Sequence, residues 1–256
     1  MPSAAILEVR GLTKRFGGLT AVSSLGFEVR EGEILGMIGP NGAGKSTTFN
    51  LIAGTYAATQ GEVRFAGEQI LGLPPHRIAA RGVMRTFQHN RPFGGMPVID
   101  NVLVGAHTRF ASGLWAVVGG RALREETQRR KRAAELIEFV GLGELPHADV
   151  ATLSFGQGRL LEIARALAGE PRLLLFDEPA AGLTLAECER LAGIIRGIAA
   201  RGIAVLLIEH DMHFLLPLAQ RVAVLNFGVK IADGLPEQIR NHPAVLEAYL
   251  GSHAAA

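Results

Sequence analysis

Cysteine is almost absent from the sequence, since Cys188 is the only one in 256 residues. A single cysteine excludes an internal disulfide and is typical of a reducing compartment. The net charge is also small, at +2, which argues against a basic face that binds nucleic acid. No window reaches the ~18 apolar residues of a membrane span, and the N-terminus lacks the pattern of a signal peptide. We therefore expect a chain that is soluble or that reaches a membrane through a partner.

Apolar residues are plentiful by contrast, at 48% of the chain. This content is enough for a sizeable core, and the length allows one large domain or two closely packed ones. Alternating apolar residues and glycine-containing turns predict strands over residues 6–38. Helical spacing predicts helices over 97–105 and 121–140, with Leu136, Ile137 and Val140 on one face. Strands and helices in this arrangement indicate an α/β fold.

The most informative stretch is Gly39-Pro40-Asn41-Gly42-Ala43-Gly44-Lys45-Ser46. It fits the phosphate-binding loop, in which glycines let backbone N–H groups approach an anion closely. Lys45 adds a positive charge at the β- and γ-phosphates, and the Ser46 hydroxyl can bind Mg²⁺. An apolar run at 33–38 predicts a buried strand before the loop, and 47–53 predicts a helix whose N-terminus points at the phosphates. The sequence therefore predicts a nucleoside-triphosphate site.

Two further apolar runs end in polar residues that suit such a site. Residues 173–176 predict a buried strand ending at Asp177, in the position that serves Mg²⁺ in P-loop enzymes. The adjacent Glu178 can accept a proton from an attacking water. Residues 204–208 predict another buried strand, which is followed by His210. Ligands bind at such strand ends in open α/β sheets, although a loop histidine without a role fits this single residue equally well.

A second candidate anion site is Leu153-Ser154-Phe155-Gly156-Gln157, which precedes an amphipathic helix predicted over 159–168. A hydroxyl, an approachable glycine backbone and a helix dipole together suit a phosphate. Taken alone, the same residues are also an ordinary N-cap.

Other features leave two interpretations open. Phe16 precedes the phosphate loop and is either a platform for an adenine ring or a core residue. Gln88 ends a predicted strand and is either a metal ligand through its amide oxygen or an ordinary polar loop residue. The basic cluster at 129–132 is either a solvated helix face or a contact for lipid headgroups or a membrane partner. Trp115 lies in an apolar loop for which we find no role.

Taken together in this order, the motifs resemble the ATP-binding-cassette family over about residues 6–250. Residues 39–46 are similar to its Walker A loop, and residues 153–157 to its LSGGQ signature, with Phe155 in place of the first Gly. The resemblance assigns roles to the remaining candidates: Phe16 as the A-loop aromatic, Gln88 as the Q-loop glutamine and a Mg²⁺ ligand, Asp177 as the Walker B aspartate, Glu178 as the catalytic glutamate and His210 as the switch histidine. Thr47, Ser154, Gly156 and Gln157 are expected to contact nucleotide.

The resemblance implies a single cassette with a RecA-like core, an antiparallel β subdomain and a helical signature subdomain. We expect the core and β subdomain at 6–90 and 166–235, the helical subdomain at 91–165, and a C-terminal helix and tail at 236–256. The family resemblance also implies that two cassettes face head to tail, so that Ser154 and Gly156 of one cover the ATP of the other. The expected cofactors are ATP and Mg²⁺.

Within the family, residues 85–93, 178–183 and 248–251 resemble the G-type ATPase of branched-chain amino-acid importers. The implied partners are a second ATPase chain, two membrane permeases and, indirectly, a periplasmic binding protein, with this chain peripheral on the cytoplasmic face of the inner membrane. Urea or amide import is the nearest alternative. An ATPase of DNA maintenance fits less well, because the chain lacks a heptad arm and zinc motifs. Thr184 stands where many members carry the D-loop aspartate, so the resemblance does not imply the contact that this aspartate makes across the pair of cassettes.

Overall fold

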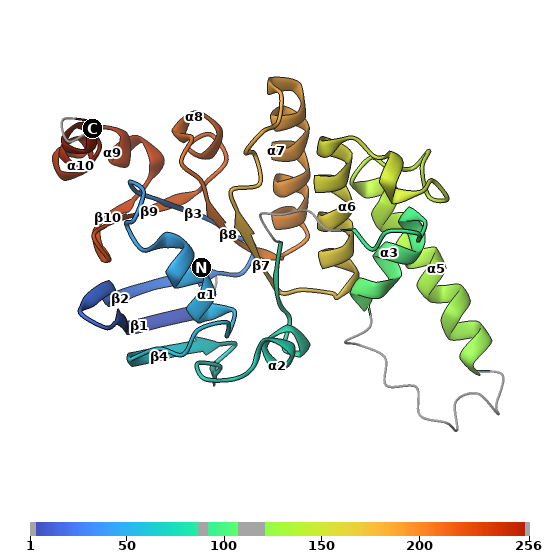
Figure 1. Ribbon diagram of the computed structural model, residues 1–256, viewed down its shortest axis with the longest axis horizontal. Helices are drawn as coiled ribbons and strands as arrows, with labels where there is room; N and C mark the ends of the chain where they lie inside the picture. Colours follow the sequence, from blue (N-terminus) through green and yellow to red (C-terminus); the bar gives the residue numbers. More distant parts are fainter. Residues whose placement is uncertain (1–3, 87–91, 107–120, 254–256) are drawn as a thin grey trace.

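The computed structural model describes residues 4–86, 92–106 and 121–253, and it contains two β-sheets with helices at both ends of the molecule (Figure 1). The antiparallel sheet has the order β2 (Leu19–Arg30), β1 (Ala5–Phe16), β4 (Gln60–Phe65), β5 (Glu68–Gln69). The second sheet has the order β10 (Val229–Gly234), β9 (Arg221–Asn226), β3 (Ile34–Ile38), β8 (Ala204–Ile208), β7 (Leu173–Asp177), β6 (Val83–Arg85). In this sheet only the β9–β10 pair is antiparallel.

The central strands β3, β7 and β8 are buried along their whole length. Parallel strands that helices and a second sheet cover on both faces need continuous apolar runs, which explains the sequence of these three segments. Alternation divides each strand between two cores: Leu173 and Leu175 face the core beneath the antiparallel sheet, whereas Leu174 and Phe176 face the core under the helices.

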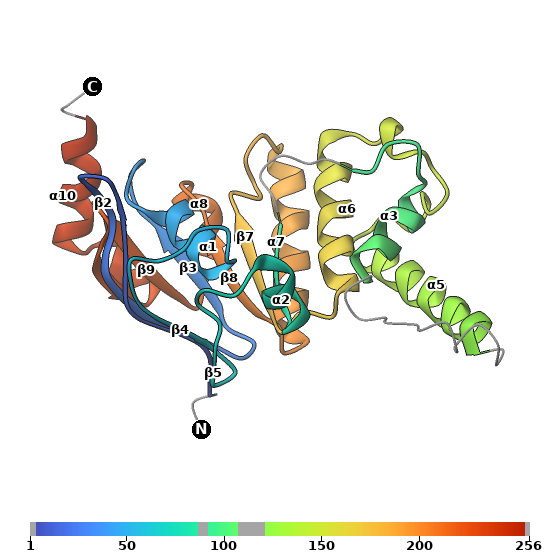
Figure 2. The same cartoon turned by 60° about the horizontal axis from the view of Figure 1, so that its bottom comes forward.

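The helices are α1 (Lys45–Ile52), α2 (Pro75–Ala80), α3 (Val98–Gly105), α5 (Arg121–Phe139), α6 (Phe155–Ala168), α7 (Leu185–Ala200), α8 (Met212–Leu215), α9 (Pro236–Arg240) and α10 (Pro243–His253). Helices α3, α5 and α6 pack against one another at one end of the molecule (Figures 1 and 2). The expected inward face of α5 is confirmed, because Leu136, Ile137 and Val140 are buried. The subdomain boundaries stay a prediction, and the one at 165/166 falls inside α6.

Two sequence predictions about helices are wrong in detail. Helix α6 begins at Phe155 rather than at the predicted Arg159, because a capping box at Ser154 starts it in spite of the low helix propensity of Gly156 and Gly158. The expected C-terminal helix is two helices, α9 and α10. Pro243 lies at the break, and proline disfavours helical backbone in the residue before it.

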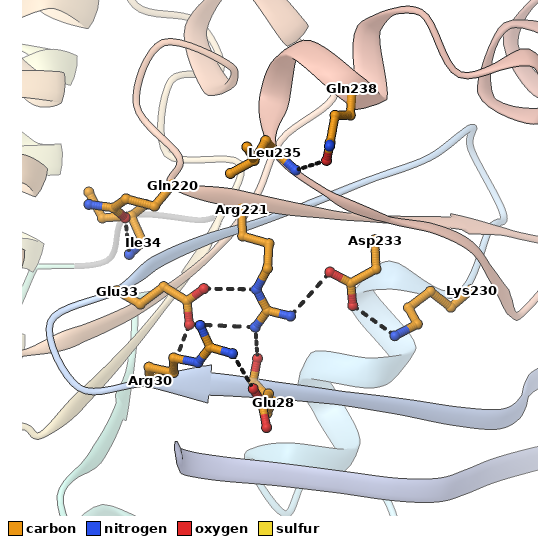
Figure 3. A network of polar contacts seen from close by, with 10 residues as sticks. All are labelled: Glu28, Arg30, Glu33, Ile34, Gln220, Arg221, Lys230, Asp233, Leu235 and Gln238. Atoms are coloured by element: carbon orange, nitrogen blue, oxygen red, sulfur yellow. Dashed lines mark hydrogen bonds and ion pairs between the residues drawn. The ribbon is translucent and has the colours of Figure 1, made fainter. Parts of the chain in front are cut away.

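A polar network centred on Arg221 joins the two sheets (Figure 3). Arg221 Nε donates to Glu33 Oε1 at 2.9 Å, and Nη1 donates to Asp233 Oδ1 at 3.1 Å. The same guanidinium donates to the backbone carbonyl of Glu28 in the antiparallel sheet. Because Arg presents several donors in a fixed fork, one side chain ties β2, β9 and β10 together and holds the antiparallel sheet beside the central one.

The arginines of the basic cluster at 129–132 are paired with acidic neighbours on their own helix. Arg129 lies 3.3 Å from Glu125, and Arg130 lies 2.9 Å from Glu126. These pairs favour the solvated-face interpretation over a lipid contact. Trp115 lies outside the described residues. Within the part of the chain that the structure describes, no helix combines the length and apolarity that crossing a membrane requires.

Candidate nucleotide site

The predicted phosphate loop connects β3 to α1 and requires glycine at two positions. Gly39 has φ of +152°, and a Cβ there would lie 2.1 Å from the carbonyl oxygen of Leu225. Gly44 has φ of +99°, and its Cβ would lie 2.5 Å from the carbonyl oxygen of Ala21. No other residue fits either place without moving backbone. The glycines therefore let the loop turn tightly between β9 and β2.

The N-terminus of α1 is open to an anion. Gly44 is its N-cap and supplies no side-chain cap, and no acidic residue occupies the first turn. Ser46 is exposed, and Thr47 is partly exposed. The first backbone N–H groups of a helix lack internal partners and carry the positive end of the dipole. Residues 44–47 thus offer a site for a phosphate group.

Lys45 folds back over this loop. Its Nζ donates to the carbonyl oxygens of Gly39 at 2.6 Å and Pro40 at 3.0 Å. Burial lowers the pKa of Lys45, whereas the nearby negative charges of Glu178 and Asp177 oppose that shift. The structure therefore gathers one ammonium and two carboxylates at the loop, which is the charge arrangement expected around a phosphate and its metal.

Asp177, at the end of β7, is paired with Arg85 at the end of β6. Arg85 Nη2 donates to Asp177 Oδ2 at 2.7 Å, and Nη1 donates to Asn50 Oδ1 in α1 at 2.6 Å. Asp177 is buried, with 5% of its side chain exposed, and Arg85 is mostly enclosed, with 14% exposed. Arg85 thus links the predicted Walker B strand to the helix that follows the phosphate loop.

Glu178 and His210 meet because β7 and β8 are adjacent parallel strands. Asp177 pairs with Ile208 in register, and the Glu178 N–H donates to the Ile208 carbonyl at 3.0 Å. His210 Nδ1 lies 4.0 Å from Glu178 Oε1. Glu178 has φ of +49°, a conformation that non-glycine residues adopt rarely and that is found at functional sites. The two predicted catalytic side chains therefore lie side by side.

The predicted signature residues lie elsewhere in the chain. The Ser154 hydroxyl accepts from the Gln157 N–H at 3.2 Å, and the Gln157 side-chain oxygen accepts from the Ser154 N–H at 2.8 Å. Ser154 and Gln157 thus form the N-cap of α6, as the simpler sequence interpretation held. In both views β7 and α7 separate α6 from α1 (Figures 1 and 2). One chain therefore does not bring Ser154, Gly156 and Gln157 to its own phosphate loop.

An exposed aromatic pair lies at the end of β1. Phe16 is 43% exposed, and its ring meets Tyr56 edge to face, with centroids 5.6 Å apart. Lys14 Nζ stands 4.7 Å from the centre of the Phe16 ring. Phe16 is consequently not a core residue, and its open face suits an adenine ring.

Three residues are predicted to bind Mg²⁺. The structure describes Ser46 and Asp177, whereas Gln88 lies outside the described residues. Among the described residues, no group of three His, Cys, Asp or Glu side chains is arranged to hold a metal. Mg²⁺ with a nucleotide needs only one or two protein oxygens and completes its shell with phosphate and water. The Ser46 hydroxyl and the Asp177 carboxylate are oxygen donors of this kind, so the residues present fit the ion.

Sequence reasoning missed three residues of this site. Tyr56 shares the aromatic pair, Arg85 holds Asp177, and Glu209 is a fully buried acid beside His210. Arg85 and Glu209 stand close in sequence to motif residues, and this proximity is the feature of the sequence that could have indicated them. Their roles depend on pairing between strands that are distant in sequence.

Comparison with known proteins agrees with these observations. A family model described as ABC transporter matches residues 22–181, and one described as branched-chain amino acid ATP-binding cassette transporter matches residues 229–255. The high-affinity branched-chain amino acid transport ATP-binding protein BraF of Pseudomonas aeruginosa is 46% identical over 97% of this chain and 99% of its own. The protein LivG of Escherichia coli, of the same description, is 42% identical over 97% and 99%.

The fold is similar to that of solved cassettes. The ADP conformation of MJ1267, an ATP-binding cassette of an ABC transporter, superposes with a TM-score of 0.86 at 31% identity, over 97% of this chain and 100% of that one. This confirms the predicted fold class. The phosphate loop, the acidic strand end, the matched family model and the full-length relatives agree, and the chain belongs to the ABC transporter family of ATP-binding cassette proteins.

Proposed function

We propose that this chain is the ATP-binding and ATP-hydrolysing subunit of an importer for branched-chain amino acids. The observation that carries the proposal is the 46% identity to BraF over 97% of this chain and 99% of that protein. The match at residues 229–255 to the model for branched-chain amino acid cassettes supports the same substrate class.

The phosphate loop binds the nucleotide in this proposal. The residues that contact it are Gly39, Pro40, Asn41, Gly42, Ala43, Gly44, Lys45, Ser46 and Thr47. Their backbone N–H groups surround the phosphates, and Lys45 leaves its carbonyl partners to neutralise the β- and γ-phosphates. Phe16 stacks on the adenine with its exposed face.

Hydrolysis takes place at the ends of β7 and β8. Glu178 accepts a proton from the attacking water, and His210 contacts the γ-phosphate and orients that water. Ser46, Asp177 and Gln88 hold Mg²⁺, which neutralises charge on the phosphates when bound. Arg85 keeps the Asp177 carboxylate directed into the site.

A second cassette completes the site. Because α6 lies away from α1 within the chain, Ser154, Gly156 and Gln157 serve the nucleotide of a partner cassette, with the dipole of α6 pointing at its phosphates. The partner is a different chain. Two membrane permeases and a periplasmic binding protein complete the importer, and this chain is peripheral on the cytoplasmic face of the inner membrane.

Transport by the assembled complex tests the proposal. The chain is purified with its permeases and partner cassette and reconstituted in vesicles, with ATP on the side of the cassettes and the binding protein on the opposite side. Uptake of labelled leucine, isoleucine and valine is compared with uptake of labelled urea. We expect ATP-dependent uptake of the three amino acids, and none with Glu178→Gln. Uptake of urea alone would overturn the substrate class, and the absence of any ATP-driven uptake would overturn the importer.

A further inference from the structure

Glu209 is a charged residue enclosed by the protein. It follows β8 directly, and none of its surface is exposed. Its Oε1 accepts a hydrogen bond from the Ala180 N–H at 2.9 Å. Its Oε2 is buried and has no well-formed hydrogen bond among the described residues. A buried carboxyl oxygen without a full bond is costly, so its presence calls for an explanation.

The imidazole of His210 faces this unsatisfied oxygen. His210 Nδ1 lies 3.9 Å from Glu209 Oε2 and 4.0 Å from Glu178 Oε1. His210 itself is largely exposed, with 59% of its side chain accessible, so a small movement of the ring brings Nδ1 to hydrogen-bond distance of Oε2. One edge of the imidazole therefore lies between two carboxyl groups, one buried and one at the nucleotide site.

Glu209 also contacts the loop that follows the catalytic acid. Ala180 lies two positions beyond Glu178, and its N–H is held by Glu209. The same loop is tied to β8 through the Glu178 N–H and the Ile208 carbonyl. The buried carboxyl thus touches both segments that carry catalytic residues in the proposed function.

The protonation of Glu209 is sensitive to this setting. The pKa of Glu209 is raised to about 7, chiefly by burial, and the Glu178 charge contributes in the same direction. The Ala180 N–H and the charge and backbone N–H of His210 act in the opposite direction. A carboxyl that is partly ionised near neutral pH is unusual outside functional sites.

A role limited to holding the loop after Glu178 in place would not require a carboxyl group at position 209. An amide or hydroxyl oxygen would accept the Ala180 N–H equally well, without placing a second carboxyl oxygen against the His210 ring. The acid adds one property, which is an acceptor for the proton on Nδ1.

We propose that Glu209 is a positioning residue that holds the Nδ1–H of His210 and the loop after Glu178, so that Nε2 of the ring is directed to the nucleotide. This inference rests on the proposed function, in which His210 meets the γ-phosphate. The Nε2 atom then donates to phosphate when the ring is protonated, or accepts from the attacking water when it is neutral. Partners of this kind fix the tautomer and orientation of a histidine.

Glu209→Gln is the sharpest test, because the two side chains have the same shape. The glutamine oxygen still accepts the Ala180 N–H, but its amide group presents a donor to His210 Nδ1. We expect the neutral ring to change from Nδ1–H to Nε2–H. Nitrogen-15 NMR of the histidine-labelled full chain at pH 8 reads this directly, with the His210 signal assigned by its loss in His210→Ala.

Turnover supplies the second readout, measured on the assembled transporter. We expect Glu209→Gln to lower kcat about 10- to 100-fold, with KM for ATP changed less than about threefold. The matched control is Glu162→Gln, which neutralises another buried glutamate, paired with Arg159 in α6, and should leave kcat within about twofold. Glu209→Asp keeps the acid and should retain more turnover than Glu209→Gln.

The outcomes separate this inference from the proposed function. An unchanged His210 tautomer in Glu209→Gln would overturn the inference. A changed tautomer with unchanged kcat would also overturn it, because the ring orientation would then not matter to the reaction. If the wild-type transporter hydrolyses no ATP, the proposed function fails, while the NMR result still decides whether Glu209 orients His210.

Discussion

Arg85→Met should destabilise the nucleotide-free chain by about 3 kcal/mol. Removing one partner of a buried ion pair leaves the other charge uncompensated, which costs about 3–5 kcal/mol in proteins. Arg85 and Asp177 are 14% and 5% exposed, and Arg85 also donates to Asn50 at 2.6 Å. The nearby Lys45 ammonium partly offsets the loss of the guanidinium, so we take the lower end of the range.

Urea denaturation followed by far-ultraviolet circular dichroism measures this effect. The matched control is Arg81→Met, because Arg81 pairs with Glu68 at 3.2 Å in solvent, with 37% and 70% of the side chains exposed. An exposed pair contributes about 0–1 kcal/mol. The double variant Arg85→Met with Asp177→Asn should recover at least about 1 kcal/mol relative to Arg85→Met alone, since it removes the stranded charge.

The reasoning is refuted if Arg85→Met loses no more stability than Arg81→Met. It is also refuted if the double variant is as unstable as the sum of the two single variants, because the two side chains would then act independently.

Two further predictions concern Thr184 and Glu209. Thr184 is the N-cap of α7, where its hydroxyl donates to Glu187 Oε2 at 2.8 Å and accepts from the Glu187 N–H. Thr184→Ala should lower the free energy of unfolding in urea by about 0.5–2 kcal/mol and have a mild effect on ATP turnover. Thr184→Asp should retain the cap. A loss of turnover as large as that of Glu178→Gln would contradict this. The pKa of Glu209 is raised from 4.5 to about 7 in the folded chain. Between pH 4.5 and 7 the folded state therefore binds more protons than the unfolded state. The stability that this group contributes is lost as pH rises through 7. Glu209→Gln should therefore match wild type at pH 4.5 and be more stable by up to about 3 kcal/mol at pH 8, and a constant difference across this range would refute the shift.

The sequence was most informative where the chemistry is local. The phosphate loop is continuous in sequence, so residues 39–46 and their flanking strand and helix could be predicted from spacing alone. The buried strands β7 and β8 could be predicted because their apolar runs end abruptly in acidic residues. Parallel pairing of neighbouring strands then places Glu178 beside His210.

Features that depend on packing were harder to predict. Arg85 and Glu209 lie beside motif residues in sequence, but their partners Asn50 and Ala180 come from other segments. Nothing in the local pattern predicts those contacts. The sequence motif presents Thr184 as a missing charge, whereas in the structure its hydroxyl caps α7. Helix starts prefer Ser, Thr, Asp and Asn, which explains this role.

The most direct test of the central claim is ATP-dependent association of Glu178→Gln protein with its partner cassette, measured together with phosphate release. The variant keeps Lys45, Ser46 and Asp177, so binding should survive. The proton acceptor is lost, so phosphate release should fall about 10²–10⁴-fold and ATP should hold the two cassettes together. Lys45→Ala is the control that should neither bind ATP nor associate. Near wild-type phosphate release by Glu178→Gln would remove this residue from catalysis, and association of Lys45→Ala with ATP would contradict the assigned phosphate loop.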